Sequence, residues 1–310
     1  MKKIISPVLL ALAAIIWGIA FVAQKAATVV SPFTLLVARS AIATFVLFFI
    51  VILFDKLRGG ERALISRGGS ERIRIDISKR EIIGGIICGA FLFIASALQQ
   101  AGIGSTDAGK TSFITALYVV IVPIYGLALR KRSPINAWIG VIIAVIGFYL
   151  LCIKEDFSIA PSDLLVFACA FVFAMQIMAI DAFSDCDGIR LSFVQFATVT
   201  LLSIVCAVIF ESGDDLRAIK TVIPEILFLG IGSSGIAYTL QILGQKNSVP
   251  AVASIILSLE SVFGAFFSAI ILAERMSARE YVGCAVVLLA VLISQIDFAA
   301  LLNEKNIKKY

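Results

Sequence analysis

Two stretches of the chain share a pattern of polar and glycine residues: LQQAGIGSTDAGKTSFITALYVVIVP, from Leu98 to Pro123, and LQILGQKNSVPAVASIILSLESVFGA, from Leu240 to Ala265. The same offset places Tyr118 opposite Glu260. Identical residues coincide at this offset, namely Gln99 with Gln241, Gly102 with Gly244, Ser112 with Ser254, and Leu117 with Leu259. Because polar and glycine positions agree as well as apolar ones, we interpret the stretches as equivalent parts of an internal repeat.

The composition around these stretches is that of a membrane protein. The chain has 310 residues, of which 60% are hydrophobic and 15% charged, and its mean hydropathy is +1.04. A soluble domain is about a quarter charged. Apolar surface in this excess has to be covered by lipid. The net charge of +5 is concentrated in a few loops, which predicts membrane topology and no nucleic-acid partner.

Apolar runs bounded by charge, proline or glycine predict ten transmembrane helices in an all-α polytopic fold. We expect Pro123 to kink the fourth of them. The predicted spans are 7–27, 33–54, 82–101, 109–129, 135–153, 162–182, 191–210, 225–244, 250–272 and 279–297.

The repeat divides these spans into two halves of five. An odd number of spans in each half requires the halves to have opposite orientations, which makes them inverted repeats. The predicted boundaries are 1–156 for the first repeat, 157–298 for the second and 299–310 for a cytoplasmic tail. Inverted repeats are typical of secondary carriers, whose substrate site lies near the membrane midplane.

Basic residues predict the orientation. With both termini in the cytoplasm, 18 Lys and Arg residues lie inside and five outside, as the positive-inside rule requires. We therefore predict a multi-pass protein of the cell inner (plasma) membrane. The only long connection is the cytoplasmic loop 55–81, which is either a solvated tether or a basic surface that touches anionic lipid.

The chain lacks the groups that most enzymes of the membrane require. It contains no histidine, no HExxH, no GxSxG and no CxxC. Gly104–Thr111 matches the P-loop pattern GxxxxGK[ST], but it joins two apolar spans and follows no predicted strand, which a nucleotide-binding loop requires. We therefore expect no catalytic residues, no metal, no cofactor and no direct use of ATP, and we predict that the protein is not an enzyme.

Five short motifs, taken in order, resemble the drug/metabolite transporter superfamily and its EamA-type branch. Trp17–Phe21 is similar to the start of that family's first helix, and Arg39–Ala43 to a stretch of its second. The others are Phe113–Pro123 in the fourth helix, and Leu259–Phe263 with Ala273–Arg275 in the ninth. The resemblance implies ten helices in two inverted repeats, and transport of amino acids or other small metabolites.

Glu260 and Tyr118 are the central candidates for a site. Glu260 lies about ten residues into its span, which at about 1.5 Å per residue is close to the midplane. Tyr118 is equally deep in the equivalent span. Glu260 either binds substrate or a proton, or is a packing carboxylate paired with an arginine or a hydroxyl.

Three basic residues lie toward the outer side of the predicted spans, against the charge bias. Arg39 either faces a wet vestibule that attracts carboxylates or phosphates, or is paired structurally. Lys25 and Lys110 either join that vestibule or cap helix ends. The aligned residues in the second half are Gln195 for Arg39 and Asp181 for Lys25.

Glutamines and aromatic residues complete the predicted site. The amides either line the ligand path or bond between helices, and the aromatic rings either wall a pocket or pack ordinarily. The full predicted set of substrate-binding residues is Trp17, Gln24, Arg39, Gln99, Lys110, Phe113, Tyr118, Gln176, Gln241 and Glu260.

These features together predict a secondary transporter that moves an amino acid or related organic solute by alternating access. Its partners would be a small-molecule substrate and the lipid bilayer, and coupling to a proton or ion gradient fits the pattern. We expect a monomer or a weak homodimer, since ten helices are enough to enclose a path. The alternative is a channel, or a membrane-embedded sensor or scaffold without transport chemistry.

Overall fold

The computed structural model describes residues 2–65, 77–131, 133–152, 160–212, 216–271 and 277–296. Within these ranges all regular secondary structure is helical. Eight stretches are long and apolar enough to cross a membrane: Ile5–Val29, Pro32–Leu57, Lys79–Ile103, Ala108–Ala128, Pro161–Ala182, Gly188–Phe210, Ile223–Gln245 and Pro250–Ile271.

The helices of the first half are α1 (Lys2–Ala26), η1 (Ala27–Val29), α2 (Pro32–Ile65), α3 (Lys79–Ile103), α4 (Ala108–Ala116), α5 (Tyr118–Ala128) and α6 (Ile135–Cys152). Those of the second are α7 (Pro161–Ala182), α8 (Gly188–Phe210), α9 (Leu216–Thr221), α10 (Ile223–Leu227), η2 (Phe228–Ala237), α11 (Tyr238–Gln245), α12 (Pro250–Leu257), α13 (Leu259–Ile271) and α14 (Ala278–Ser294).

Eight of the ten predicted spans coincide with these membrane-crossing stretches. The other two correspond to α6, whose apolar stretch is Ile135–Leu150, and to α14, which has 17 residues. Both are short for a span of about 20 residues, so the count of ten stays a prediction.

The structure corrects the predicted end of the second span. We expected it to stop at residue 54, but α2 continues to Ile65. The first part of the predicted loop 55–81 is therefore helical. Residues 55–65 contain no proline, and their Lys, Arg, Glu, Leu and Ala residues are good helix formers, which outweighs the two glycines Gly59 and Gly60. Residues 66–76 of this loop, the Ala273–Arg275 motif and the tail 299–310 lie outside the described residues.

Two spans are interrupted near their middle. In the fourth, α4 ends at Ala116 and α5 begins at Tyr118, with Leu117 N–H donating to the Ile114 carbonyl three residues back at 3.2 Å. This break precedes Pro123, where we expected a kink; Pro123 lies inside α5. In the ninth span, Ser258 separates α12 from α13, and the Ser261 N–H donates to the Ser258 carbonyl three residues back at 3.1 Å. Each break is a tight, 3₁₀-like turn.

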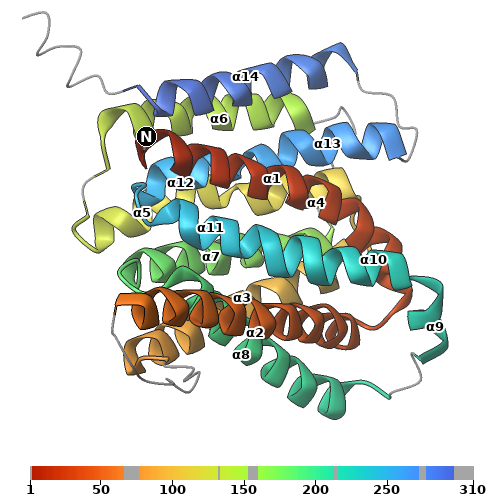
Figure 1. Ribbon diagram of the computed structural model, residues 1–310. Coiled ribbons are helices and arrows are strands. Elements are labelled where there is room, and N and C mark those ends of the chain that lie inside the picture. Colours follow the sequence, from red (N-terminus) through yellow and green to blue (C-terminus); the bar gives the residue numbers. More distant parts are fainter. Residues whose placement is uncertain are drawn as a thin grey trace, which may run out of the picture.

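The helices pack in pairs that join the two halves. α2 packs against α8, α3 against α7 and α8, α1 against α13, η2 and α11, and α6 against α14. Figure 1 shows α6 and α14 side by side along one edge of the bundle. Glycines permit the closest approach: a Cβ on Gly18 would lie 2.4 Å from Cβ of Phe263, and one on Gly264 would lie 2.8 Å from Oγ of Ser112.

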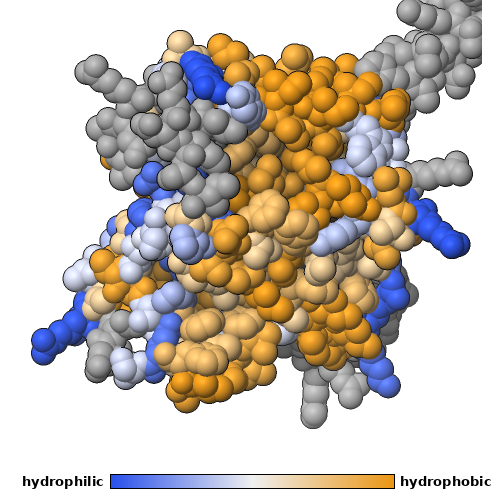
Figure 2. Space-filling view, turned by 180° about the vertical axis from the view of Figure 1, so that it is seen from behind, coloured by the Kyte–Doolittle hydropathy of each residue, from blue (hydrophilic) through white to orange (hydrophobic). Residues whose placement is uncertain are grey.

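A broad hydrophobic surface surrounds the bundle. In Figure 2 orange side chains fill the middle of the molecule, and blue ones gather toward the left and right edges. Large apolar side chains stand fully outward here, as at Val208, which is 79% exposed, and Phe210, 70% exposed. In water such a surface would aggregate, so we assign it to the lipid-facing belt.

Ion pairs lie at the two ends of the bundle. We call the end where α1 begins and α14 ends the terminal end. It holds Arg80 with Asp185 at 2.6 Å, Arg190 with Asp55 at 2.6 Å, and Lys131 with Asp181. The hydrogen bond and charge of Arg80 lower the pKa of Asp185, which lies in the turn between α7 and α8. These contacts tie α3, the end of α5, and α2 to the α7–α8 hairpin.

Candidate functional site

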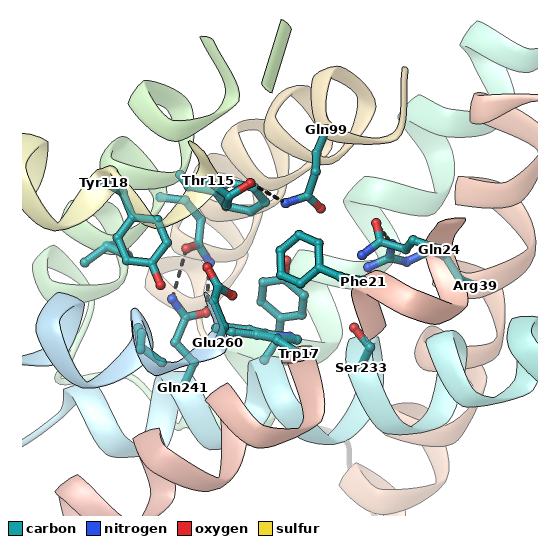
Figure 3. A pocket seen from close by; sticks show the side chains of 15 residues that line it. Trp17, Phe21, Gln24, Arg39, Gln99, Thr115, Tyr118, Ser233, Gln241 and Glu260 are labelled. Atoms are coloured by element: carbon teal, nitrogen blue, oxygen red, sulfur yellow. Dashed lines mark hydrogen bonds between the residues drawn. The ribbon is translucent and has the colours of Figure 1, made fainter. Parts of the chain in front are cut away.

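A pocket lies between the two halves. It draws side chains from α1, α2, α3, α4 and α5 of the first half, and from α7, η2, α11, α12 and α13 of the second. Figure 3 shows these side chains converging from the surrounding helices. The lining residues are Trp17, Phe21, Gln24, Arg39, Gln99, Thr115, Tyr118, Phe173, Gln176, Ile177, Ser233, Tyr238, Gln241, Leu257 and Glu260.

Glu260 places a carboxyl group in this pocket. It is the second residue of α13, directly after the break at Ser258, and is only 4% exposed. Its Oε1 has no hydrogen-bond partner in the described part of the chain, and neither has the hydroxyl of Tyr118 that faces it. Among the described residues no Lys or Arg pairs with it, which removes the pairing with arginine that sequence analysis left open.

Arg39 places a guanidinium group in the same pocket, and it too is only 4% exposed. Its Nε donates to Oγ of Ser234 at 3.1 Å and its Nη1 to Oε1 of Gln24 at 3.3 Å. Both partners are neutral, and within the described residues no carboxylate lies at ion-pair distance. A buried cation with only neutral partners is costly and defaults to a functional role.

Glutamine amides form two hydrogen-bonded groups around the cavity. In the first half, Nε2 of Gln99 donates to Oγ1 of Thr115 at 3.1 Å. In the second, Nε2 of Gln241 donates to Oε1 of Gln176 at 3.2 Å, and Gln176 reaches Gln195 at 3.4 Å. Gln99 and Gln241, which the repeat aligns, both line the pocket. An amide both donates and accepts, so these groups can bind either kind of polar substrate atom.

Aromatic rings form the apolar wall. The ring centroids of Trp17 and Tyr238 lie 4.7 Å apart, and those of Tyr238 and Phe196 lie 5.6 Å apart. The indole Nε1 of Trp17 has no hydrogen-bond partner in the described residues. A largely apolar wall with a few convergent polar groups is the usual form of a small-molecule site.

Eight of the ten predicted site residues line this pocket, and two do not. Nζ of Lys110 instead lies 2.6 Å from Oδ2 of Asp163. Phe113 packs edge-on against Phe148, with centroids 5.9 Å apart. Phe113 thus packs in the ordinary way, and Lys110 forms an ion pair outside the pocket lining. Any contact between these two residues and substrate stays a prediction.

Lys25 also lies outside the pocket lining. Its Nζ donates to the carbonyls of Ile103, Gly104 and Thr106 at 3.0, 3.1 and 3.0 Å. These carbonyls stand at the end of α3, where a cation is favoured by the free carbonyl groups and the helix dipole. This is the helix-capping alternative stated from the sequence.

Sequence reasoning left seven lining residues out of the predicted set: Phe21, Thr115, Phe173, Ile177, Ser233, Tyr238 and Leu257. Helical spacing could have added two of them. Thr115 and Tyr238 lie three residues before Tyr118 and Gln241, which puts them on the same helix face. Ser233 lies in η2, a π-helix, whose wider turn breaks this spacing.

Comparison with known proteins agrees with this architecture. The model of the EamA-like transporter family matches residues 4–153 and 160–295. A protein of Archaeoglobus fulgidus named an uncharacterized transporter is 30% identical over 298 residues, covering 94% of this chain and 86% of the relative.

Two further similarities are more distant. A protein of Methanothermobacter thermautotrophicus, also named an uncharacterized transporter, is 25% identical over 208 residues, covering 64% of this chain and 60% of the relative. A solved crystal structure superposes with a TM-score of 0.70 at 17% identity, over 93% of this chain and 96% of the other. The last similarity concerns the fold alone.

Proposed function

The chain belongs to the EamA-like transporter family of the drug/metabolite transporter superfamily, and from that premise we propose that it is a secondary transporter for an amino acid or related organic solute. The observation that carries the proposal is the pocket between the halves, in which Glu260 and Arg39 are buried without an ion-pair partner in the described chain. Groups of this kind in a membrane mark substrate or ion pathways.

The proposed architecture has ten transmembrane helices in two inverted repeats, residues 1–156 and 157–298, followed by the tail 299–310. The packing supports it. α2 packs on its counterpart α8, and α6 on its counterpart α14, as helices beside a two-fold axis must. α3 packs on α7. Their counterparts in the other half, α11 with η2 for α3 and α1 for α7, pack on each other in the same way. The two separate family matches fall on the same halves.

Alternating access is the mechanism that we propose for this arrangement. One half would rock against the other, exposing the pocket first to one side of the membrane and then to the other. The breaks after α4 and α12 support the proposal, because interrupted helices are typical of carrier binding sites. Tyr118 and Glu260, each next to a break, lie where the moving halves meet.

We propose a plasma-membrane location with the terminal end of the bundle in the cytoplasm. The excess of 18 basic residues over five supports this orientation. Protons are the proposed coupling ion, because Glu260 is a carboxyl group that substrate or solvent reaches only through the pocket. A monomer, or a weak homodimer, is sufficient because the site lies within one chain.

The alternative is a channel, or a sensor or scaffold. The position of the pocket between two repeated halves favours a carrier. Purified protein is reconstituted into liposomes preloaded with the twenty protein amino acids, and uptake of each labelled amino acid is measured. Saturable uptake that is stimulated by internal substrate (counterflow) supports a carrier. Single-channel conductance would establish a channel. The absence of both counterflow and conductance would favour the sensor or scaffold.

Glu260→Gln tests the role of the carboxyl group. The amide keeps the shape of the side chain but loses its charge and its proton. We expect at least a tenfold lower counterflow rate, about 1.4 kcal/mol in the barrier, and loss of stimulation by a pH gradient. Glu225→Gln, in α10 and outside the pocket lining, is the matched control and should retain the wild-type rate. An unchanged rate and pH response for Glu260→Gln would remove this role.

A further inference from the structure

Resting on the proposed function, we infer that Arg39, Gln24 and Ser234 form a carboxylate-binding subsite at one side of the pocket. The substrate is therefore a small organic acid or zwitterion whose carboxylate is held by the Arg39 guanidinium. In Figure 3, Arg39 and Gln24 lie at one side of the pocket and Tyr118 and Glu260 at the other, with Phe21 between them in this view.

The hydrogen bonds of Arg39 leave the subsite incomplete. A guanidinium has five N–H donors in a planar fork. Within the described residues the group makes two hydrogen bonds, to Ser234 and to Gln24, and each goes to a neutral oxygen. The side chain is only 4% exposed and lines the cavity, so water offers few further acceptors. An anion entering the pocket would supply both the remaining acceptors and the missing charge.

The surrounding backbone holds Arg39 in this position. η2 approaches α2 closely at Gly230, where a Cβ would lie 2.8 Å from Cβ of Ile42 and 3.1 Å from the Arg39 carbonyl oxygen. This approach puts Ser234 against the guanidinium, while the neighbouring Ser233 lines the pocket. π-helical segments occur frequently at functional sites, and here the segment sets the orientation of the cation.

Charge balance favours a carboxylate over a phosphate dianion. Arg39 is the only Lys or Arg among the pocket-lining residues, and Glu260 is the only acidic one. A carboxylate on Arg39 is balanced if the substrate carries an amine toward Glu260, or if Glu260 carries a proton. A dianion would leave excess negative charge in a buried site. The planar carboxylate also matches two N–H groups of the fork.

The second half has no equivalent cation. The residue aligned with Arg39 is Gln195, which is fully buried, and its Nε2 has no hydrogen-bond partner in the described part of the chain. The pocket therefore recognises the acid group from one side only. The substrate carboxylate therefore points toward Arg39 in the first half. Two identical halves would not produce this preference.

The test is binding by purified wild-type protein and by Arg39→Gln, Arg39→Lys and Ser234→Ala. The probes are the twenty protein amino acids, straight-chain monocarboxylates from acetate to hexanoate, the primary amides of all these acids, and inorganic phosphate. Affinity is measured by thermal shift and calorimetry in detergent. Ser40→Ala is the control, because Ser40 is a buried neighbour on α2 whose hydroxyl donates to the Leu36 carbonyl outside the pocket.

We expect at least one carboxylate to bind wild type and Ser40→Ala equally, its amide to bind about tenfold more weakly or worse, and Arg39→Gln to remove that difference. Arg39→Lys should recover part of the affinity, because it keeps the charge without the fork. Ser234→Ala should weaken carboxylate binding while leaving the fold intact, which keeps the test decisive if Arg39→Gln does not fold.

Three results would overturn the inference: no carboxylate binds wild type, amides bind as well as acids, or phosphate is preferred. Counterflow in liposomes, run in parallel, separates this inference from the proposed function. Transport that is insensitive to Arg39→Gln would refute the subsite and leave the carrier. Carboxylate binding that depends on Arg39, without any transport, would refute the carrier and leave the subsite.

Discussion

Tyr118 and Glu260 each stand next to the break of an interrupted helix, and the tyrosine hydroxyl faces the carboxyl group in the pocket without a hydrogen-bond partner among the described residues. The two positions are equivalent in the internal repeat. The chain has thus evolved different side chains, one neutral and one acidic, at one place in the two halves. The repeat is therefore symmetric in its helices but not in the side chains of the site.

Tyr118→Phe should therefore separate function from stability. The buried hydroxyl has no hydrogen-bond partner among the described residues, so its removal leaves no donor or acceptor there unsatisfied. We therefore expect the free energy of unfolding to change by less than about 1 kcal/mol. Transport should fall, because the hydroxyl is free to bind substrate or the Glu260 proton. Thermal melts in detergent and counterflow rates measure the two quantities. A large loss of stability with unchanged transport would contradict this assignment.

Close helix contact at Gly18 gives a second prediction. A methyl group there would lie 2.4 Å from Cβ and 2.8 Å from the backbone carbon of Phe263, so α1 and α13 would have to separate. We expect Gly18→Ala to destabilise the protein by about 1–3 kcal/mol and to reduce transport, because α1 and α13 both line the pocket.

Gly109→Ala is the matched control for that substitution. Nothing lies within 4 Å of a Cβ at Gly109, which is also helical. Alanine is a better helix former than glycine by about 1 kcal/mol, so this variant should be as stable as wild type or more stable. Equal destabilisation of both variants in thermal melts would refute the packing explanation.

The spans and the central site could be predicted from the sequence because they depend on local properties. Hydropathy locates a span, and depth along the helix places Glu260 and Arg39 near the pocket. Neither hydropathy nor depth tells which direction a side chain faces around the helix axis. Lys110 is included in the predicted site, yet its partner Asp163 lies on α7, and only the packing of α4 on α7 brings them together.

The interrupted helices could not be predicted for a related reason. The visible signal was Pro123, but the breaks lie at Leu117 and Ser258, residue types that occur in ordinary helices. The π-helical segment η2 was equally hidden. Its form depends on the close approach of Gly230 to α2, which is a property of the packed bundle and not of the segment itself.

The Lys110–Asp163 pair gives a third prediction. The carboxylate also accepts hydrogen bonds from the Thr106 hydroxyl at 3.0 Å and the Ala160 N–H at 2.7 Å. Lys110→Met leaves a largely buried charge without its cation, so we expect a loss of about 1–3 kcal/mol in stability. The carboxylate binding proposed for Arg39 should not change, since Lys110 lies outside the pocket.

The double variant Lys110→Met with Asp163→Asn decides whether the charge is the cause. Removing both charges should recover most of the lost stability, because the asparagine oxygen can accept from the Ala160 N–H while its amide donates to the Thr106 hydroxyl, and its burial carries no ionic penalty. Failure to recover would mean that Lys110 acts through packing of its hydrocarbon stem.

The Arg80–Asp185 pair at the terminal end predicts a pH dependence. Arg80 lowers the pKa of Asp185 in the folded protein below the unfolded value of about 3.9. The pair therefore contributes stability above about pH 4, and this contribution is lost as the pH falls through the folded pKa, because the unfolded chain then binds the proton more readily. Both side chains are more than half exposed, so the effect is small and screened by salt.

Asp185→Asn tests this prediction by melting temperatures of the two proteins at low salt across pH 7 to 3. We expect the wild type to be slightly more stable than the variant from pH 7 down to about pH 4, and the two curves to converge below that. The gap above pH 4 should close in high salt, since surface ion pairs are screened over about 3 Å at 1 M. A gap that does not narrow as the pH falls below 4, or that grows with salt, would show that Asp185 stabilises the α7–α8 turn by means other than its charge.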